Sequence, residues 1–340
     1  MTSPQPLAIL GTGMATAVGL HAAAACAAIR VKLTNPVESR FVDGDGEWIT
    51  AHSVPLPKLL RGGAKLAHMA AMVIDECLEN VPHEEWDRIP LLLCLAEGTR
   101  PGRWQDERLF ADIRELAGAD FASGSLIVPQ GRVSIALALE HARKLIYQGN
   151  ASEALIVGTD SLLEWPALRV FEEQSRLLSE NNTDGFLPGE AAAGILVGRP
   201  AAGSQLLIEG LGFATEPAPI ESGEPLRAEG LTEAIRAALR DAGCEMHDLD
   251  FRITDISGEQ YYFKEASLAL TRLLRQRKEQ FDLWHPAECI GETGSAIGPA
   301  MLVVAQMACA KAYAAGPAVL VHASNDAGQR AAIVARYRER

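Results

Sequence analysis

The side chains that usually act as nucleophiles, bases or metal ligands occur in this sequence, but without the spacing that such chemistry requires. Six cysteines are present, at positions 26, 77, 94, 244, 289 and 309. They form no Cys-X-X-Cys pair, so we expect reduced thiols in a cytoplasmic protein and no disulfide framework or zinc site. The eight histidines include no HExxH pair, and we expect no metal or cofactor. Ser134 and Ser257 lie outside any GxSxG motif, which argues against a serine hydrolase.

A glycine motif, Gly11-Thr12-Gly13, follows the first apolar run and could begin a dinucleotide site. Thr16 stands where that fingerprint needs a third small residue, and no acidic residue ends a second strand at the usual distance. We therefore expect these glycines to allow a tight turn from a strand into the Ala-rich helix that ends near Arg30.

The passage around this motif recurs later in the chain. Ile9–Thr16 and Ile208–Thr215 are identical at five of eight positions, at an offset of 199 residues. A second echo pairs Ala142–Val157 with Ala308–Val321, each a helix followed by a glycine and an apolar strand. Repeats of this length indicate a duplicated α/β domain rather than a solenoid.

The boundary between the two copies is expected near Pro200–Gly203, which gives an N-terminal half of residues 1–200 and a C-terminal half of residues 201–340. Short continuous apolar runs, such as Leu91–Leu95 and Val319–Val321, fit strands that helices cover on both faces.

The composition is that of an ordinary globular protein, with 340 residues, 48% of them hydrophobic, and a net charge of −13. A nucleic-acid-binding protein would need a basic face, which this acidic balance argues against. The sequence has no apolar run long enough to cross a bilayer and no signal-peptide pattern, so we expect neither a membrane span nor secretion.

Four passages carry a resemblance to a known family, in that family's order. They are Leu7–Asn35, Arg132–Asp160, Asp184–Val197 (DGFLPGEAAAGILV) and Gly291–Gly298 (GETGSAIG). They resemble blocks of the β-ketoacyl synthases, and the third is the most specific because that family has DGFxxGEGAxxxVL there. The resemblance implies an α/β protein with the duplicated thiolase fold, in five layers αβαβα. This agrees with the repeat found independently.

In the β-ketoacyl synthases that the sequence resembles, a nucleophilic cysteine lies at a strand-to-helix elbow, where the helix N-terminus stabilises its thiolate. Counting back from Gly149 without gaps puts Arg132 at that position, and a register slip would put Gln130 there. No cysteine lies within Val128–Ser134, and Ile135 stands where the elbow's glycine is expected.

The two catalytic histidines of the β-ketoacyl synthases are also replaced in this sequence. Ser257 takes the place of the first, Glu292 that of the second, and Ala287 that of the nearby lysine. A carboxylate at position 292 would repel the oxyanion that the histidines normally stabilise, so condensation is not supported. We expect a remnant site made of the former triad positions Arg132, Ser257 and Glu292 and the pocket residues Gln130, Gly131, Phe186, Cys289 and Asn325.

Two other thiols could be proposed as nucleophiles. Cys289 lies three residues before Glu292, and Cys94 lies within the apolar run LLLCL. We expect both to be buried apolar residues. Arg132 and Glu292 could bind an anionic ligand and its partner, but we expect them to form an ion pair that fills the site.

Three functions remain open at this point. The first is a catalytically inactive synthase-like scaffold, adaptor or accessory partner. It would resemble the chain-length subunits of aromatic polyketide systems or accessory proteins encoded beside type VI secretion effectors. The second is a divergent acyltransferase or condensing enzyme that acts on acyl-carrier-protein or coenzyme A thioesters. The third is a small-molecule binding module that uses the remnant pocket.

The resemblance also implies a dimer. The family pairs through an edge strand of the first half, here near Ser125–Val128. An unpaired apolar edge is a liability unless another chain covers it. We therefore expect a homodimer, or a heterodimer with a related synthase, with an effector or carrier protein as a possible further partner.

Overall fold

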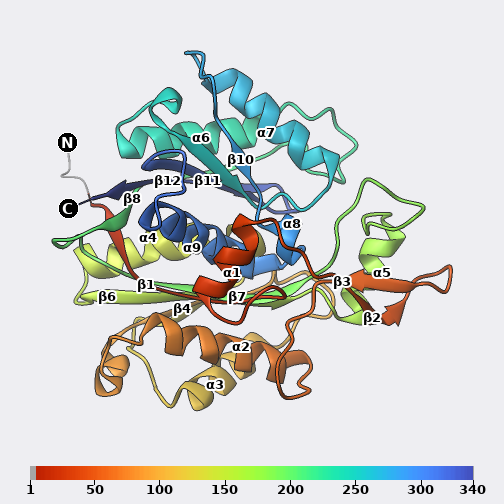
Figure 1. The fold of residues 1–340 in the computed structure, drawn as a ribbon, viewed down its shortest axis with the longest axis horizontal. Coiled ribbons are helices and arrows are strands. Elements are labelled where there is room, and N and C mark those ends of the chain that lie inside the picture. Colours follow the sequence, from red (N-terminus) through yellow and green to blue (C-terminus); the bar gives the residue numbers. More distant parts are fainter. Residues whose placement is uncertain (1–4, 340) are drawn as a thin grey trace.

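The computed structural model describes residues 5–339, in which strands and helices alternate along most of the chain (Figure 1). The strands are β1 (Leu7–Ala15), β2 (Val37–Val42), β3 (Trp48–Ala51), β4 (Leu91–Cys94), β5 (Leu126–Val128), β6 (Glu153–Ser161), β7 (Glu190–Gly198), β8 (Gln205–Thr215), β9 (Phe251–Thr254), β10 (Leu283–Trp284), β11 (Ala318–Ser324) and β12 (Gln329–Arg338). The α-helices are α1 (Ala22–Arg30), α2 (Gly62–Cys77), α3 (Asp106–Ala117), α4 (Ser134–Tyr147), α5 (Trp165–Glu173), α6 (Glu229–Ala242), α7 (Gln260–Leu273), α8 (Ala287–Ile290) and α9 (Ile297–Ala310).

Ten of these strands form one hydrogen-bonded series in the order β10-β9-β11-β12-β8-β1-β7-β6-β4-β5. The series folds into two layers, since β1 and β8 pair only at Leu7 with Ile208 and at Ala8 with Leu207. From this junction outward, both layers repeat the same order of strands: β1-β7-β6-β4-β5 in one, and β8-β12-β11-β9-β10 in the other.

Helices separate and cover the two sheets (Figure 1). Helices α2 and α3 lie on the outer face of the first sheet, α6 and α7 lie on the outer face of the second, and α4 and α9 lie between the two. The largest apolar core joins α4 and α9 to the inner faces of both sheets. The predicted five-layered αβαβα architecture is confirmed, whereas the division of the chain at residues 200/201 stays a prediction.

The glycines of the repeated motif do not make a turn, contrary to the prediction. Gly11 and Gly13 lie inside β1, and Gly210 and Gly212 lie inside β8. A Cβ on any of them would overlap a backbone carbonyl of the helix above: α2 for the first pair and α6 for the second. Both motifs therefore let a helix approach its strand closely, which accounts for their recurrence in both halves.

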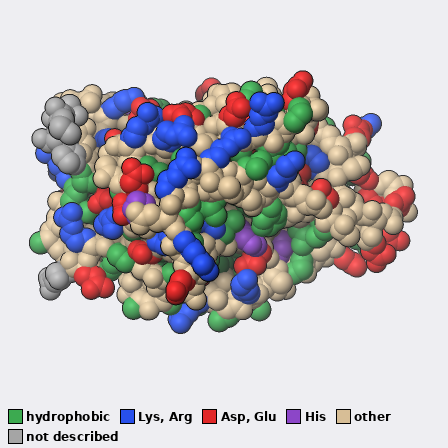
Figure 2. Space-filling view, turned by 90° about the horizontal axis from the view of Figure 1, so that it is seen from above, with side chains coloured by type: hydrophobic (Ala, Val, Ile, Leu, Met, Phe, Trp, Pro, Cys, Tyr) green, Lys and Arg blue, Asp and Glu red, His purple; other side chains and the backbone are tan. Residues whose placement is uncertain are grey.

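Basic and acidic side chains are interspersed on the face above α6 and α7, and acidic side chains gather at the end of the molecule that carries the β2–β3 hairpin (Figure 2). Asp45 and Glu47 are exposed in this hairpin. Within residues 5–339, no helix combines the length and the apolarity that crossing a bilayer requires.

Candidate functional site

Arg132 lies at the junction between a strand and a helix, as predicted. Strand β5 ends at Val128, a 3₁₀ turn covers Gly131–Val133, and α4 begins at Ser134. Gly131 has a φ of +56°, and a Cβ there would overlap the carboxylate of Glu97, so the turn requires glycine. The residues after the turn are buried and pack toward α9. The turn and this packing together hold Arg132 in place.

The second half of the chain supplies the partners of Arg132. Glu292 follows α8, and its Oε2 lies 3.2 Å from Nη1 of Arg132. The Ser257 hydroxyl, in the loop after β9, donates to the same oxygen at 2.9 Å. The backbone N–H of Gly294 donates to Oε1 at 3.0 Å. The predicted contact between Arg132 and Glu292 is thus confirmed, and Ser257 joins it.

The Arg132 guanidinium has further partners that the sequence did not predict. It donates to the Tyr262 hydroxyl at 2.8 Å and to Oδ1 of Asp326 at 2.7 Å. Asp255 lies 3.6 Å from its Nε, and the guanidinium carbon lies 4.7 Å from the centre of the Tyr262 ring. The Arg132 side chain is only 6% exposed, so three carboxylates and a phenol compensate one buried cation.

A second arginine extends this network. Arg176 donates to both oxygens of Glu259, at 2.7 and 2.9 Å, and to Oδ2 of Asp326 at 2.8 Å. The Tyr262 hydroxyl also donates to Asp326, at 2.5 Å. Burial raises the pKa of Asp326, but the guanidinium groups of Arg132 and Arg176 outweigh it and hold that pKa below its usual range. Asp326 is therefore a carboxylate that joins the two arginines.

Glu292 has the opposite balance. Burial raises the pKa of Glu292 to about 7, because removal of the carboxylate from water outweighs the attraction of Arg132. Asp255 adds to the rise by repulsion, whereas the hydrogen bond from Ser257 opposes it. At neutral pH this carboxyl group is therefore divided between its neutral and ionised forms.

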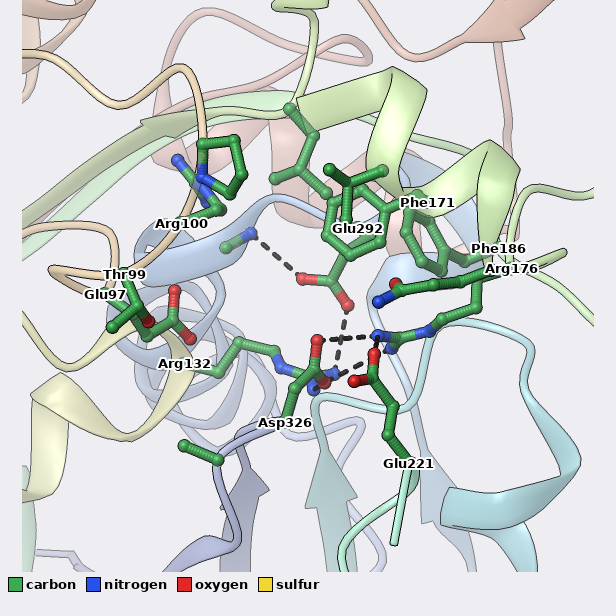
Figure 3. Close-up of a pocket in the computed structure, with 16 residues that line it drawn as sticks. Glu97, Thr99, Arg100, Arg132, Phe171, Arg176, Phe186, Glu221, Glu292 and Asp326 are labelled. Carbon is green, nitrogen blue, oxygen red and sulfur yellow. Dashed lines mark hydrogen bonds and ion pairs between the residues drawn. The ribbon is translucent and has the colours of Figure 1, made fainter. Parts of the chain in front are cut away.

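The network borders a cavity of about 270 Å³ (Figure 3). The residues that line it are Glu97, Thr99, Arg100, Pro101, Arg132, Leu162, Val170, Phe171, Gln174, Arg176, Phe186, Glu221, Glu292, Gly294, Asp326 and Ala327. Charged groups thus form a large part of the wall, and the aromatic rings of Phe171 and Phe186 lie on the side of Arg176 (Figure 3).

Of the predicted pocket residues, Phe186 lines the cavity, whereas Gln130, Gly131, Cys289 and Asn325 are not among the lining residues. The Asn325 amide binds Gln329 at 2.7 Å, which holds its side chain within its own turn. Cys289 is fully buried in α8, within the central apolar core.

Cys94 and Cys309 resemble Cys289, because they too are buried thiols with a raised pKa. Burial, with a contribution from Glu288, raises the pKa of Cys289 to about 11. Burial likewise raises the pKa of Cys94, and that of Cys309 to about 11. Among the described residues no cysteine or histidine lines the cavity. A thiolate nucleophile would therefore have to come from elsewhere.

Sequence reasoning missed most of the residues that carry charge at the site. Arg100 pairs with Asp160, whose Oδ2 also accepts the Ser295 backbone N–H at 2.9 Å. Arg176, Glu259 and Asp326 come from loops and helix ends. In the sequence, these three residues stand out only because they lie near the passages that resemble β-ketoacyl synthases. That position does not show which side chains they contact. Within residues 5–339, no group of three His, Cys, Asp or Glu side chains is placed to hold a metal ion.

Comparison with known proteins by sequence finds no match, either among protein-family models or among curated proteins. Solved structures match nearly the whole chain. A type II polyketide synthase acyl-carrier protein in complex with its ketosynthase (AntDE:AntF) has a TM-score of 0.82 at 14% identity, with coverage of 98% of this chain and 100% of that one.

Two further matches are ketosynthases with their chain length factors. The ishigamide ketosynthase/chain length factor has a TM-score of 0.78 at 15% identity, covering 98% of this chain and 99% of that one. The ketosynthase ApeO in complex with its chain length factor ApeC, from Xenorhabdus doucetiae, has a TM-score of 0.74 at 14% identity, covering 98% of each chain. At these identities the similarity establishes the architecture: this chain has the ketosynthase, or thiolase, fold over nearly its whole length.

Proposed function

We propose that this protein is a non-catalytic member of the ketosynthase-fold proteins and acts as an accessory partner of another protein. The observation that carries the proposal is the environment of Arg132. At the elbow where a condensing enzyme needs a thiolate, this chain has a guanidinium bound to Glu292, Tyr262 and Asp326. A buried side chain with three hydrogen-bond partners is a fixed part of the interior.

The charges around the cavity also disfavour acyl transfer. Attack on a thioester carbonyl develops negative charge on oxygen, which donors must stabilise. Glu97, Glu292 and Asp326 all border the cavity, and the nearby arginine donors already bind carboxylates. The cavity of about 270 Å³ therefore offers an oxyanion few free donors and several repelling groups.

The proposed partner is a related synthase, which would make a heterodimer. Two of the similar structures are described as a ketosynthase with its chain length factor. In this chain β5 ends the series of strands, with Leu126 and Ile127 half-buried. That edge could pair with the same edge of a second subunit. Analogy with accessory proteins encoded beside type VI secretion effectors adds an effector or carrier protein as a further candidate partner.

Incubation with acyl- and malonyl-thioesters of coenzyme A and of acyl-carrier protein, followed by intact mass spectrometry, tests the catalytic part. We expect no covalent adduct on the wild-type chain and no ketoacyl product from Arg132→Cys, because catalytic groups that act as a unit do not recover activity singly. An adduct on the wild type would instead favour the alternative, a divergent acyltransferase or condensing enzyme, and product from Arg132→Cys would overturn the interpretation of the site as unable to support condensation. Cys289→Ser would show whether that thiol carries an adduct.

Co-purification with candidate partners tests the accessory role. The tagged chain is expressed with a ketosynthase from the same genome or with a neighbouring effector, and the complex is sized by light scattering. A stable complex that contains one copy of each chain is the expected result. Purification of the chain with none of these partners would argue against this role.

A further inference from the structure

A second cavity, of about 330 Å³, shares no lining residue with the site described above. It is lined by Ile29, Arg30, Lys32, Leu283, Trp284, His285, Pro286, Glu288, Val304 and Tyr313. These residues come from the end of α1, from β10 and α8, and from α9 and the turn after it. Its volume lies at the lower end of the range of about 300–1,000 Å³ that is usual for small-molecule sites.

An ordered column of flat groups forms one wall of this cavity. The Arg30 guanidinium carbon lies 4.4 Å from the centre of the Tyr313 ring. That ring stacks on Trp284 at 6.3 Å with an interplanar angle of 19°. Trp284 packs in turn at 4.8 Å against Phe251, which is fully buried in β9. The column therefore runs from the surface into the core, and a ligand would meet it already ordered.

The polar groups on the column are donors without protein partners. Among the described residues, no carboxylate lies within 4.0 Å of the Arg30 guanidinium, whereas Lys32 pairs with Glu288 at 3.5 Å. Within residues 5–339, no protein group is hydrogen-bonded to the Tyr313 hydroxyl or to the Trp284 indole N–H. Burial raises the pKa of Tyr313 to about 12, so its hydroxyl keeps a proton to donate.

The geometry of Arg30 favours a planar anion. A guanidinium that stacks on a ring keeps its N–H groups in its own plane, where they can bind both oxygens of a carboxylate. Ile29, Leu283, Pro286 and Val304 form the apolar part of the wall, and His285 and the Lys32–Glu288 pair form the rest. Arg30 is exposed and has no carboxylate of the described residues beside it, so one negative charge on an apolar body matches it, whereas a second negative charge would lie near the carboxylate of Glu288.

We propose that this cavity binds a small monocarboxylic acid with an aryl or alkyl body, with its carboxylate on Arg30 and its apolar part against Trp284 and Tyr313. The site is separate from the cavity beside Arg132, and the proposal does not depend on the proposed accessory function.

Isothermal titration calorimetry with phenylacetate tests this proposal, with phenylacetamide as the neutral control. We expect phenylacetate to bind and the amide to bind at least about tenfold more weakly, since the amide cannot pair with a cation. Arg30→Gln should weaken phenylacetate by about the same factor and abolish the difference between acid and amide. Arg30→Lys should retain part of it, because the charge remains while the planar fork is lost.

Arg275→Gln is the matched control, since Arg275 is an exposed arginine outside both cavities, and it should leave phenylacetate binding unchanged. Trp284→Ala should weaken both compounds, because it removes the apolar contact that they share. The proposal is overturned if the wild type binds no phenylacetate up to about 10 mM, if acid and amide bind equally, or if Arg275→Gln weakens binding as much as Arg30→Gln.

Discussion

Arg132 is a permanent cation in an interior position, and its surroundings show how such a group is tolerated. An unpaired buried charge costs several kcal/mol, so the fold must supply compensating groups. Here Asp326 supplies a full negative charge, Glu292 and Asp255 supply carboxyl groups whose pKa burial raises, and Tyr262 supplies both an acceptor and a ring face. The carboxylates depend on the arginine as much as the arginine depends on them.

Replacement of Arg132 by methionine should therefore destabilise the protein strongly. Methionine fills much of the volume but leaves the three carboxylates without their cation, and removal of one partner from a buried ionic group costs about 3–5 kcal/mol. Urea denaturation at neutral pH, followed by circular dichroism, measures the change in the free energy of unfolding.

Arg132→Lys separates charge from hydrogen-bonding geometry in this experiment. Lysine keeps the positive charge but cannot reach Tyr262, Glu292 and Asp326 with a planar fork, so an intermediate loss is expected. A loss below about 1 kcal/mol for Arg132→Met, the size seen for exposed pairs, would contradict the buried network described above.

Glu292 should make stability depend on pH near neutrality. Its pKa is raised from 4.5 to about 7 in the folded protein. The folded state therefore holds a proton that the unfolded chain releases at lower pH, which favours folding at acid pH. This contribution is lost as the pH rises through about 7.

Glu292→Gln removes that titration while it preserves the shape of the side chain. Between about pH 5 and pH 8, the stability of the variant should rise relative to the wild type by up to about 3 kcal/mol. Urea denaturation across this range gives the difference, and the exposed Glu288→Gln serves as control. Parallel curves for Glu292→Gln and the wild type would show that Glu292 does not titrate there.

At the residue scale, the sequence predicted the contact between Arg132 and Glu292 but not the other members of the charged network. Counting along family-like blocks placed Arg132 and Glu292 near each other, because opposite charges that enter one interior site must pair. Arg176 and Asp326 could not be paired in this way. They lie 150 residues apart, in segments without periodicity, and only the folded loops bring them together.

At the scale of the elements, the close approach of helices to strands depends on glycine. Gly212 in β8 lies beneath α6, and a Cβ there would overlap the carbonyl oxygen of Ala234. Because the obstacle is helix backbone, no side-chain rotation can relieve the overlap, and α6 must move away from the sheet.

Gly212→Ala should therefore lower the free energy of unfolding by at least about 2 kcal/mol, through displacement of α6 and loss of packing. Gly98→Ala is the control, since nothing lies within 4 Å of a Cβ at that position, and it should change stability by no more than about 0.5 kcal/mol. Thermal or urea denaturation of both variants checks the comparison. Equal effects would show that the contact with α6 is not tight.

Buried strands could be predicted from their apolar runs, but the structural role of the Gly11–Gly13 motif could not. Apolar runs at Leu91–Leu95 and Val319–Val321 became β4 and β11, because a strand covered on both faces needs apolar residues throughout. The Gly11–Gly13 motif was interpreted as a turn, yet it lies within β1. Glycine marks both turns and close backbone approaches, and the sequence alone does not distinguish them.

At the scale of the whole molecule, β5 leaves one margin of the ten-stranded series without a neighbour in the described chain. Ile127 is half-buried there, between Leu126 and Val128. If this edge pairs with a second subunit, a charge at its centre should prevent assembly, since lysine on an edge strand blocks strand addition.

We therefore expect the wild type to form a dimer, either with itself or with the related synthase, and Ile127→Lys to be monomeric in both mixtures with an unchanged far-ultraviolet circular dichroism spectrum. Light scattering coupled to gel filtration measures the mass of each. Val37→Lys, on the exposed strand β2, is the matched control and should stay dimeric. A wild type that stays monomeric at all concentrations, both alone and with the related synthase, would exclude pairing at β5, and a dimeric Ile127→Lys would place the interface elsewhere.

The central position of β1 has a consequence for biosynthesis. This strand is synthesised well before both of its neighbours, β7 at Glu190–Gly198 and β8 at Gln205–Thr215. At about 5–20 residues per second, the nascent chain waits about 10–40 s before β1 can be paired. During that interval an apolar strand is exposed, which gives chaperones that bind nascent chains a defined target in β1.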